Sequence, residues 1–503
     1  MAMKMFAAIE VGSYGLYMGV YQISSGRVKK IDEVRHMLAL GREVYAKGKL
    51  SYDTVEEICQ VLFRYSDMMK TYGVEKYQAY ATSAMREAKN HEIVVDQIRV
   101  RTGIHVKLIS NSELRFISYK AIASREGEFQ KIIQKGTAIA DVGFGSMQIS
   151  LFDKDALVST QNLPLGVLRL KGMLAQARVN DRISCGMIEE VVENELFTFR
   201  KMYLKDRNIR HLIGIGGSVD QLLRKMPDGT VRDRITAWEL QEFYEKVLRM
   251  NEEQIADTFD VNVEMASLVL PGIIIFKHLM DVTGAEMFWL PGISLLDGMA
   301  AEYAEDNKLV KFNHRFSEDI IETARNMAKR YKCQTSHVQM VEKHVLDIFD
   351  VMKKYHGLGD RERLLLQIAA NLHGCGKFIS IRNSSQCTYN IIMSTEIIGL
   401  SHKEREMVAY MAKYVVQPFQ YDQIDRPVDL AKLVAILRLA NSMDRGHRQK
   451  LADCRMRMKD GELVITTEYP EDITLERIAF ENSVEFFEEI YGIRPVLKQK
   501  RRV

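Results

Sequence analysis

The sequence predicts an α/β fold in which two similar halves are followed by an all-α domain and a small C-terminal α/β domain. First, an apolar strand, an acid, a glycine turn and a second strand occur twice, as AAIEVGSYGLYMGVY and AIADVGFGSMQISLF. Second, strand signals stop near residue 304 and apolar residues at helical spacing dominate to about residue 450. A repeat offset by about 130 residues indicates two related halves that face each other across a cleft.

The individual elements follow from periodicity and turn residues. In the first half we expect two strands joined by a Gly-Ser turn at residues 5–22, then a helix at 52–72. A strand that runs into a helix follows at 76–88, then a strand at 105–110 and a helix at 114–125. The second half restarts with three strands, and HLIGIGGSVDQLLRK adds another strand and glycine turn. Near the end, an Asp-Gly pair between alternating residues predicts a hairpin, followed by a helix and a strand. The expected domains are 1–125, 126–303, 304–448 and 449–503.

Composition limits the possible functions of this 503-residue chain. Its formal net charge is only +3, so no overall field favours nucleic acid as a partner. The N-terminus carries an acid at Glu10 and lacks the long apolar stretch of a signal peptide. No run of about eighteen apolar residues stands out, so no membrane span is expected. Six scattered cysteines without a CxxC pair indicate reduced thiols and a cytoplasmic location.

The repeated acid–glycine turns carry the chemistry. A carboxylate at a strand end binds a hydrated Mg²⁺ or a water, while the N–H groups of the adjacent turn bind phosphate oxygens. Glycine allows the close approach that a side chain would block. One such turn alone is more often structural, whereas three in one chain favour phosphate binding. The three turns contain Glu10, Gly12 and Ser13; Asp141, Gly143, Gly145 and Ser146; and Gly214, Gly216, Gly217 and Ser218.

The order of motifs resembles one family over nearly the whole chain. AAIEVGS resembles that family's AAIDLGSNS, ATSAMREAKN its ATSALREAxN, LISNSELRF its ISGxEEARL, IADVGFGSMQISLF its IDIGGGSTEL, LPLGVLRL its PLGxVRL and GIGGSVDQL its GTGGTxxxL. In the helical part, NLHGCGKFISI resembles LHDIGxxI, and VAILRLANSMDRGH resembles AxILRLADALDRSH. The family is that of exopolyphosphatases and guanosine pentaphosphate phosphohydrolases.

This resemblance implies a fold, an activity and a set of site residues. The fold would be two actin-like domains of the sugar kinase/Hsp70/actin, RNase H-like type, then a helical HD-like domain and the small α/β domain. The activity would be release of the terminal phosphate of inorganic polyphosphate, or the 5′ phosphate of guanosine pentaphosphate, by Mg²⁺-assisted attack of water. Asp141 and Glu10 would bind the metal. Phosphate would be held by Ser13, Arg86, Gly143, Gly145, Ser146, Gly216, Gly217 and Ser218. Family members are often homodimers.

Several positions depart from the family pattern. The family's general base is the second Glu of ISGxEEA, and without gaps that position is Leu114. Glu113 stands beside it and becomes the candidate base after a shift of one residue, although adjacent helical positions point about 100° apart. The opening acid is Glu10 instead of Asp, and Phe144 interrupts the glycine trio. Tyr14-Gly15 replaces Asn-Ser, and Met147 replaces Thr. Together these changes indicate an altered substrate or weakened chemistry.

The helical part contains an incomplete metal motif. His344, His373 and Asp444 follow the order of a His/His-Asp/Asp site, but Gly374 stands where the Asp belongs, so we expect no metal there.

Two alternatives remain at this point. One is a catalytically inactive family member that binds polyphosphate or guanosine tetra- or pentaphosphate as a sensor. Leu114 and Gly374 favour this alternative. The other is a sugar or acetate kinase on the same fold, for which no adenosine pocket or sugar-binding acid is found in the sequence.

Overall fold

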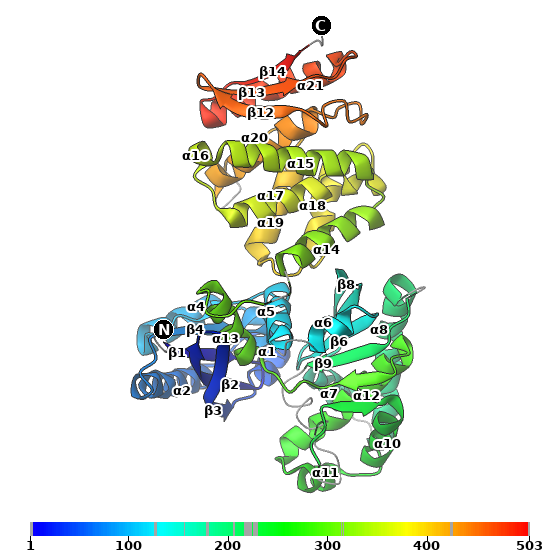
Figure 1. Cartoon of the computed structure of the whole chain (residues 1–503). Coiled ribbons are helices and arrows are strands. Elements are labelled where there is room, and N and C mark those ends of the chain that lie inside the picture. The colour runs from blue at the N-terminus through cyan, green and yellow to red at the C-terminus, as the bar shows by residue number, and fades with distance from the viewer. Residues whose placement is uncertain are drawn as a thin grey trace. The chain divides into compact units, whose positions relative to one another are not determined.

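The chain forms two compact units, Met1–Phe316 and Ser317–Val503 (Figure 1). The computed structural model describes residues 4–124, 128–154, 156–177, 181–204, 207–215, 224, 230–312, 314, 316–422 and 426–500.

The first half of unit 1 is built on a five-stranded sheet of order β3-β2-β1-β4-β5. β1, β2 and β3 form an antiparallel meander, and β4 and β5 run parallel to β1. Central β1 is buried on both faces, because Ala7 and Ile9 join one apolar core while Phe6 and Ala8 join another. The elements are β1 (Lys4–Val11), β2 (Gly15–Ser24), β3 (Arg27–Met37), α1 (Leu40–Lys47), α2 (Tyr52–Thr71), β4 (Lys76–Ala81), α3 (Ser83–Glu87), α4 (His91–Thr102), β5 (Lys107–Leu108) and α5 (Asn111–Ala123).

The second half repeats this plan on a six-stranded sheet of order β10-β11-β9-β6-β7-β8. β6, β7 and β8 form the same antiparallel meander, and β9 lies parallel to β6 as β4 lies to β1. The predicted duplication and actin-like α/β architecture are therefore confirmed. The elements are α6 (Glu128–Ile133), β6 (Thr137–Val142), β7 (Met147–Asp153), β8 (Ala156–Leu163), α7 (Val167–Ala177), α8 (Asp181–Phe199), η1 (Arg200–Leu204), β9 (His211–Ile215), β10 (Arg234–Thr236), α10 (Ala237–Val247), α11 (Glu252–Phe259), α12 (Val263–Thr283), β11 (Met287–Trp289) and α13 (Leu295–Asp306).

Helix α12 is the core helix of the second half. By length and composition alone its Met265–Thr283 stretch is apolar enough to cross a membrane, which the sequence expectation overlooked. In the fold, 72% of that window is buried, and Ile273, Ile274 and Phe276 are fully enclosed by the second core. Its hydrophobicity is therefore explained by burial against the sheet.

Helix α13 returns the chain to the first half. Its Leu296, Met299 and Ala300 pack with Phe6 and Ala8 on the face of the first sheet. The two halves of unit 1 are thus joined both by the segment after α5 and by the segment leading into α13.

The N-terminus of α5 differs from its predicted position. We expected a strand to residue 110 and a helix from 114, but β5 is only two residues long and the helix begins at Asn111. The reason is a capping box: the Ser110 hydroxyl accepts a hydrogen bond from Glu113 N, and Glu113 Oε2 accepts one from Ser110 N.

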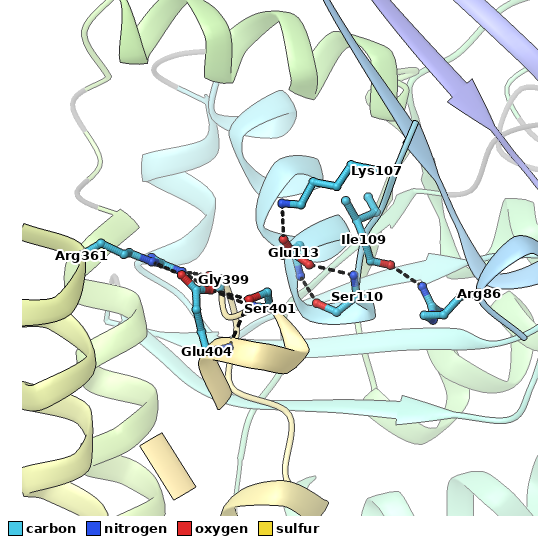
Figure 2. A network of polar contacts seen from close by, with 9 residues as sticks. All are labelled: Arg86, Lys107, Ile109, Ser110, Glu113, Arg361, Gly399, Ser401 and Glu404. Carbon is cyan, nitrogen blue, oxygen red and sulfur yellow. Dashed lines mark hydrogen bonds and ion pairs between the residues drawn. The ribbon is translucent and has the colours of Figure 1, made fainter. Parts of the chain in front are cut away.

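Unit 2 consists of helices followed by a three-stranded sheet of order β12-β13-β14. The predicted hairpin is present, with Asp460 and Gly461 both at positive φ (53° and 80°) as a two-residue turn requires. Arg361 joins two helices through bidentate bonds to Glu404 of 2.6 and 2.9 Å (Figure 2). The elements are α14 (Phe316–Arg330), α15 (Thr335–Val351), α16 (Lys353–His356), α17 (Asp360–Leu372), η2 (Cys375–Phe378), α18 (Ser384–Ser394), α19 (His402–Tyr414), α20 (Pro427–Ser442), β12 (Arg455–Lys459), β13 (Glu462–Thr467), α21 (Thr474–Tyr491) and β14 (Pro495–Gln499).

Candidate active site

The two repeated acids meet at one cavity of about 160 Å³ between the halves of unit 1. Glu10 and Asp141 each lie one residue before the end of their strand, β1 and β6, so the duplication places them at equivalent positions. Residues of both halves line the cavity: Glu10, Gly12, Ser13, Tyr17, Glu33, Arg35, Thr82, Ser83, Asn111, Leu114 and Ser118 from the first, and Asp141, Val142, Gly143, Phe144, Gly145, Ser146, Gln148, Val167 and Ile215 from the second, with Ile293, Ser294, Leu295 and Leu296.

Burial controls the charge of these acids. It raises the pKa of Glu10 to about 7, with repulsion from Asp141 and Glu33 as further causes. Burial likewise raises the pKa of Asp141 to about 7. Neither carboxylate has a hydrogen-bond or ion-pair partner among the residues that the structure describes. Burial thus outweighs any favourable charge near the pair, and both carboxyls titrate near neutral pH.

Arg115 supplies the positive charge that acts on Asp141. Its side chain is 1% exposed, and its charge lowers the pKa of Asp141, opposing the effect of burial. Its Nε donates to Gln148 Oε1 at 2.8 Å and its Nη1 donates to the Thr160 hydroxyl. Sequence reasoning missed this residue, although it follows directly after Leu114 in the motif that contains the family's base.

The glycine turns bring backbone N–H groups to the cavity. Gly12 N donates to Gly15 O (2.8 Å), and Gly143 N donates to Ser146 O (3.0 Å), so the two turns have the same internal bond. The N–H groups of Gly145 and Ser146 have no acceptor among the described residues, which leaves them available to an anion.

Close packing explains two glycines at the second turn. A Cβ on Gly145 would collide with the Tyr45 hydroxyl, and a Cβ on Gly166 would collide with the backbone of residues 144–146. At Gly166 the clash is with backbone, so only glycine permits this approach, which holds the turn against the start of α7.

Ser13, a predicted phosphate ligand, lies in the cavity lining but is engaged within the protein. Its hydroxyl accepts a hydrogen bond from Ala84 N (3.2 Å) and lies 2.9 Å from the Ser83 hydroxyl. It therefore ties the first turn to α3.

Two departures from the family pattern contact each other. Tyr14 of the first turn stacks on Phe144 of the second, with ring centroids 5.0 Å apart and planes 23° from parallel. Tyr14 is only 2% exposed, so its ring is part of the packing between the halves. The aromatic pair thus joins the two turns across the cleft.

This contact predicts a measurable coupling. In a double-mutant cycle with Tyr14→Leu and Phe144→Leu, we expect a coupling energy of about 0.5–1.5 kcal/mol, because offset-stacked rings attract beyond their buried area. Chemical denaturation of the two single variants and the double variant measures it. Additivity within about 0.3 kcal/mol would contradict a direct contact.

Leu114, and not Glu113, faces the cavity. Leu114 lines it together with Glu10 and Asp141. Glu113 is absent from the lining, and its carboxylate is held by Ser110 N and, at 2.8 Å, by Lys107 Nζ (Figure 2). The hypothesis that a one-residue shift brings Glu113 to the water is therefore not supported. The physical reason is the capping box, which directs the Glu113 side chain back to the start of the helix.

Replacement of Glu113 tests this assignment. For Glu113→Ala we expect a loss of about 1 kcal/mol of stability, because the helix loses its capping carboxylate, and phosphate release unchanged within about twofold. Thermal unfolding and a phosphate-release assay measure the two effects, with Glu92→Ala on α4 as an exposed control. A fall in rate of about 10²-fold or more would instead restore Glu113 as the general base.

Arg86 is directed away from its predicted role. Its guanidinium donates to Ile109 O and to Asn111 Oδ1, both at 2.5 Å (Figure 2 shows the first bond). Arg86 is not among the residues that line the cavity, whereas Asn111 is. In this structure Arg86 positions the loop before α5.

Of the remaining phosphate ligands predicted, Gly143, Gly145 and Ser146 line the cavity, while Gly216, Gly217 and Ser218 lie outside the described residues.

Glu33 and Arg35 are lining residues that sequence reasoning did not find. Both come from β3, and they are paired with each other at 2.6 Å, while Lys30 pairs with Glu33 at 2.7 Å. The charged sequence of β3 matches no motif of the family. Only the antiparallel meander of β1, β2 and β3 places these two residues at the cavity that Glu10 and Asp141 line.

The site has features that suit a divalent cation. Two enclosed carboxylates without protein partners are oxygen ligands of the kind Mg²⁺ prefers. Among the described residues, no group of three or more His, Cys, Asp or Glu side chains is placed to hold a metal. Mg²⁺ commonly takes one or two carboxylates and completes its shell with water and substrate phosphates, so the pair Glu10 and Asp141 fits it.

Three histidines of unit 2, His337, His373 and His447, are in contact with one another through His337. His337, which sequence reasoning did not select, lies 2.9 Å from Asp444 and 3.3 Å from His373, and it stacks on His447. His344 lies elsewhere, fully buried beside Cys454, and burial lowers its pKa to about 4. Of the three motif residues, for which we expected no metal, His373 and Asp444 each contact His337, which lies two helical turns before His344 on α15.

Comparisons with known proteins agree with this architecture. The chain is 20% identical over 413 residues to the guanosine-5′-triphosphate,3′-diphosphate pyrophosphatase of Photobacterium profundum, covering 81% of this chain and 80% of that protein. A solved Ppx/GppA family member from Aquifex aeolicus is 22% identical with a TM-score of 0.52, covering 62% of this chain and all of that one. An exopolyphosphatase from Cytophaga hutchinsonii is 17% identical with a TM-score of 0.52, covering 61% and 99%. The two solved structures show the fold.

Sequence profiles identify the family itself. The Ppx/GppA phosphatase family matches residues 19–305, and domain III of Ppx/GppA phosphatases matches residues 321–481. These matches cover more than half of the chain and fall in both compact units. The chain therefore belongs to the Ppx/GppA phosphatase family.

Proposed function

We propose that this chain is an exopolyphosphatase-type phosphohydrolase that releases the terminal orthophosphate of inorganic polyphosphate, or the 5′ phosphate of guanosine pentaphosphate. The observation that carries the proposal is the pair of enclosed carboxylates, Glu10 and Asp141, beside the available N–H groups of Gly145 and Ser146. Both family substrates present a terminal phosphoanhydride, so one site of this kind suits either.

The chain's own residues supply binding and charge positioning. Asp141 and Glu10 would hold Mg²⁺, which when bound neutralises phosphate charge and orients the phosphoanhydride. The N–H groups of Gly145 and Ser146 would bind phosphate oxygens, and Asn111 and Ser118 add polar groups to the wall. Because Leu114 carries no proton acceptor, we propose that turnover is slow relative to a site with a carboxylate there.

A second function follows from the same leucine. A family member that holds its ligand but lacks a base facing the cavity would act as a sensor of polyphosphate or guanosine tetra- or pentaphosphate. Leu114 in the cavity lining, with Glu113 held in the helix cap, favours this candidate.

One pair of measurements separates the two functions. Calorimetric titration with polyphosphate and with guanosine pentaphosphate, each with Mg²⁺ or with a chelator, measures binding, and phosphate release is assayed in parallel. Mg²⁺-dependent binding with release above the Asp141→Asn background supports the hydrolase, and binding with release at that background supports the sensor. No binding to either ligand would refute both.

The proposal extends to a cytoplasmic homodimer. All six cysteines are free, as suits a reducing compartment, and the family resemblance supports a dimer. Light scattering on the purified chain measures its mass, and a monomer at micromolar concentration would contradict the dimer.

A further inference from the structure

Two cysteines of unit 2 that are far apart in the sequence lie in contact. Cys333 Sγ and Cys375 Sγ are 3.5 Å apart, although the residues are 42 positions apart. Cys333 follows α14 and is partly exposed, while Cys375 begins η2 and is fully buried. We infer that Cys333 and Cys375 form a reversible disulfide, which makes this pair a peroxide-sensitive modification site.

The surroundings favour Cys333 as the thiol that reacts first. A hydrogen bond from the Cys375 thiol and the positive charge of Lys377 lower the pKa of Cys333. Partial exposure lets an oxidant reach it, and the thiolate is the reactive form. The buried neighbour has the opposite property, because its contact with Cys333 and its burial raise the pKa of Cys375.

The geometry allows closure by a small movement of one side. Cys375 is held in place, since Gly376 N donates to the Thr388 hydroxyl at 2.9 Å. Cys333 lies in the short connection between α14 and α15, next to Lys332 at a positive φ of 53°. A disulfide needs an S–S distance of about 2.05 Å, so the sulfurs must approach by roughly 1.5 Å, which a connection of this kind accommodates more readily than a helix.

The reaction balances with hydrogen peroxide as the oxidant. The Cys333 thiolate attacks one peroxide oxygen, the O–O bond breaks, and Cys333 becomes a sulfenic acid while hydroxide leaves and takes up a proton as water. The Cys375 sulfur then attacks the Cys333 sulfur, and the displaced oxygen leaves as a second water with the Cys375 proton. Two thiols are oxidised by two electrons, and one peroxide is reduced to two waters.

The link would join two structural elements that frame the histidine group. Gln334, next to Cys333, contacts His447, and His373, close to Cys375, contacts His337. A covalent bond at this point ties the start of α15 to the end of α17. Oxidation would therefore stabilise unit 2 by closing a long loop.

The test uses the full chain, reduced beforehand and then exposed to hydrogen peroxide. We expect peptide mapping after alkylation to find one linked peptide pair containing Cys333 and Cys375, with two fewer reactive thiols, and a thiol reductant to reverse it. The transition that reports unit 2 should rise by roughly 5–10 °C on oxidation. Cys387→Ser, at another partly exposed thiol on α18, should form the same link, and Cys333→Ser should not.

A further variant separates the two steps. In Cys375→Ser the Cys333 sulfenic acid should persist and be labelled by a 1,3-dione; if that variant does not fold, the wild-type and Cys333→Ser maps still decide. The inference is overturned if the wild type gives no Cys333–Cys375 peptide while peroxide oxidises other thiols, or if Cys333→Ser shows the same thermal shift.

Discussion

Replacement of Asp141 by asparagine is expected to stabilise unit 1 at pH 8 and to abolish Mg²⁺-dependent phosphate release. The pKa of Asp141 is raised from 3.8 to about 7, so the folded chain holds a proton that the unfolded chain has released above about pH 4. The stability from that proton is complete below pH 4 and is lost as the pH rises through 7. Asparagine does not ionise, so the variant keeps this stability in alkaline solution.

The expected size is large for a single substitution. A shift of about three pKa units in a fully buried group corresponds to at most about 4 kcal/mol, and we expect about 2–4 kcal/mol at pH 8. Part of the gain comes from Glu10, because the repulsion that raises its pKa disappears with the Asp141 charge. At pH 4 the wild type and the variant should differ little.

Two measurements check this prediction. Thermal unfolding at pH 4 and pH 8 gives the stability of each protein, with Asp153→Asn, at the exposed end of β7, as a control that should change neither value. Added Mg²⁺ should raise the unfolding temperature of the wild type at pH 8 and leave that of Asp141→Asn unchanged. A variant less stable than the wild type at pH 8, or one that still releases phosphate with Mg²⁺, would refute the assigned role.

Placing a carboxylate at position 114 is expected to increase phosphate release by about 10²–10⁴-fold, the usual contribution of a general base. Leu114 lines the cavity with Glu10 and Asp141, so Leu114→Glu introduces a proton acceptor beside the pair proposed to bind the metal. A third acid in this enclosed site should also lower stability at pH 8, because its ionised form is poorly solvated there.

The control for this substitution is Leu114→Gln, which has the same shape as the glutamate variant and cannot take up a proton. Rates are measured at saturating Mg²⁺ on polyphosphate and on guanosine pentaphosphate. A gain restricted to the carboxylate variant supports general-base catalysis and identifies the substrate by the larger gain. If Leu114→Glu and Leu114→Gln both release phosphate at the wild-type rate, a base at position 114 does not restore catalysis. The function as a sensor then explains the site better than the function as a hydrolase.

Much of the fold could be predicted from sequence alone. The repeat around Glu10 and Asp141 predicted two related halves, since similar patterns of strand, acid and glycine turn fold in the same way. The hairpin at Asp460-Gly461 followed from turn chemistry that requires positive φ at both positions. The extent of β5 and the start of α5 were not predicted, because a local capping bond between Ser110 and Glu113 overrode the periodicity.

The sequence by itself determined that this chain has a duplicated acid–glycine turn and a family motif order, because both are linear patterns. Only the tertiary structure decided which neighbouring side chain enters the cavity: the rotation of α5 places Leu114 inside and Glu113 in the cap. It also brought the Tyr14 and Phe144 rings and the two sulfurs of Cys333 and Cys375 together. Such contacts depend on the packing of distant segments, which no local spacing records.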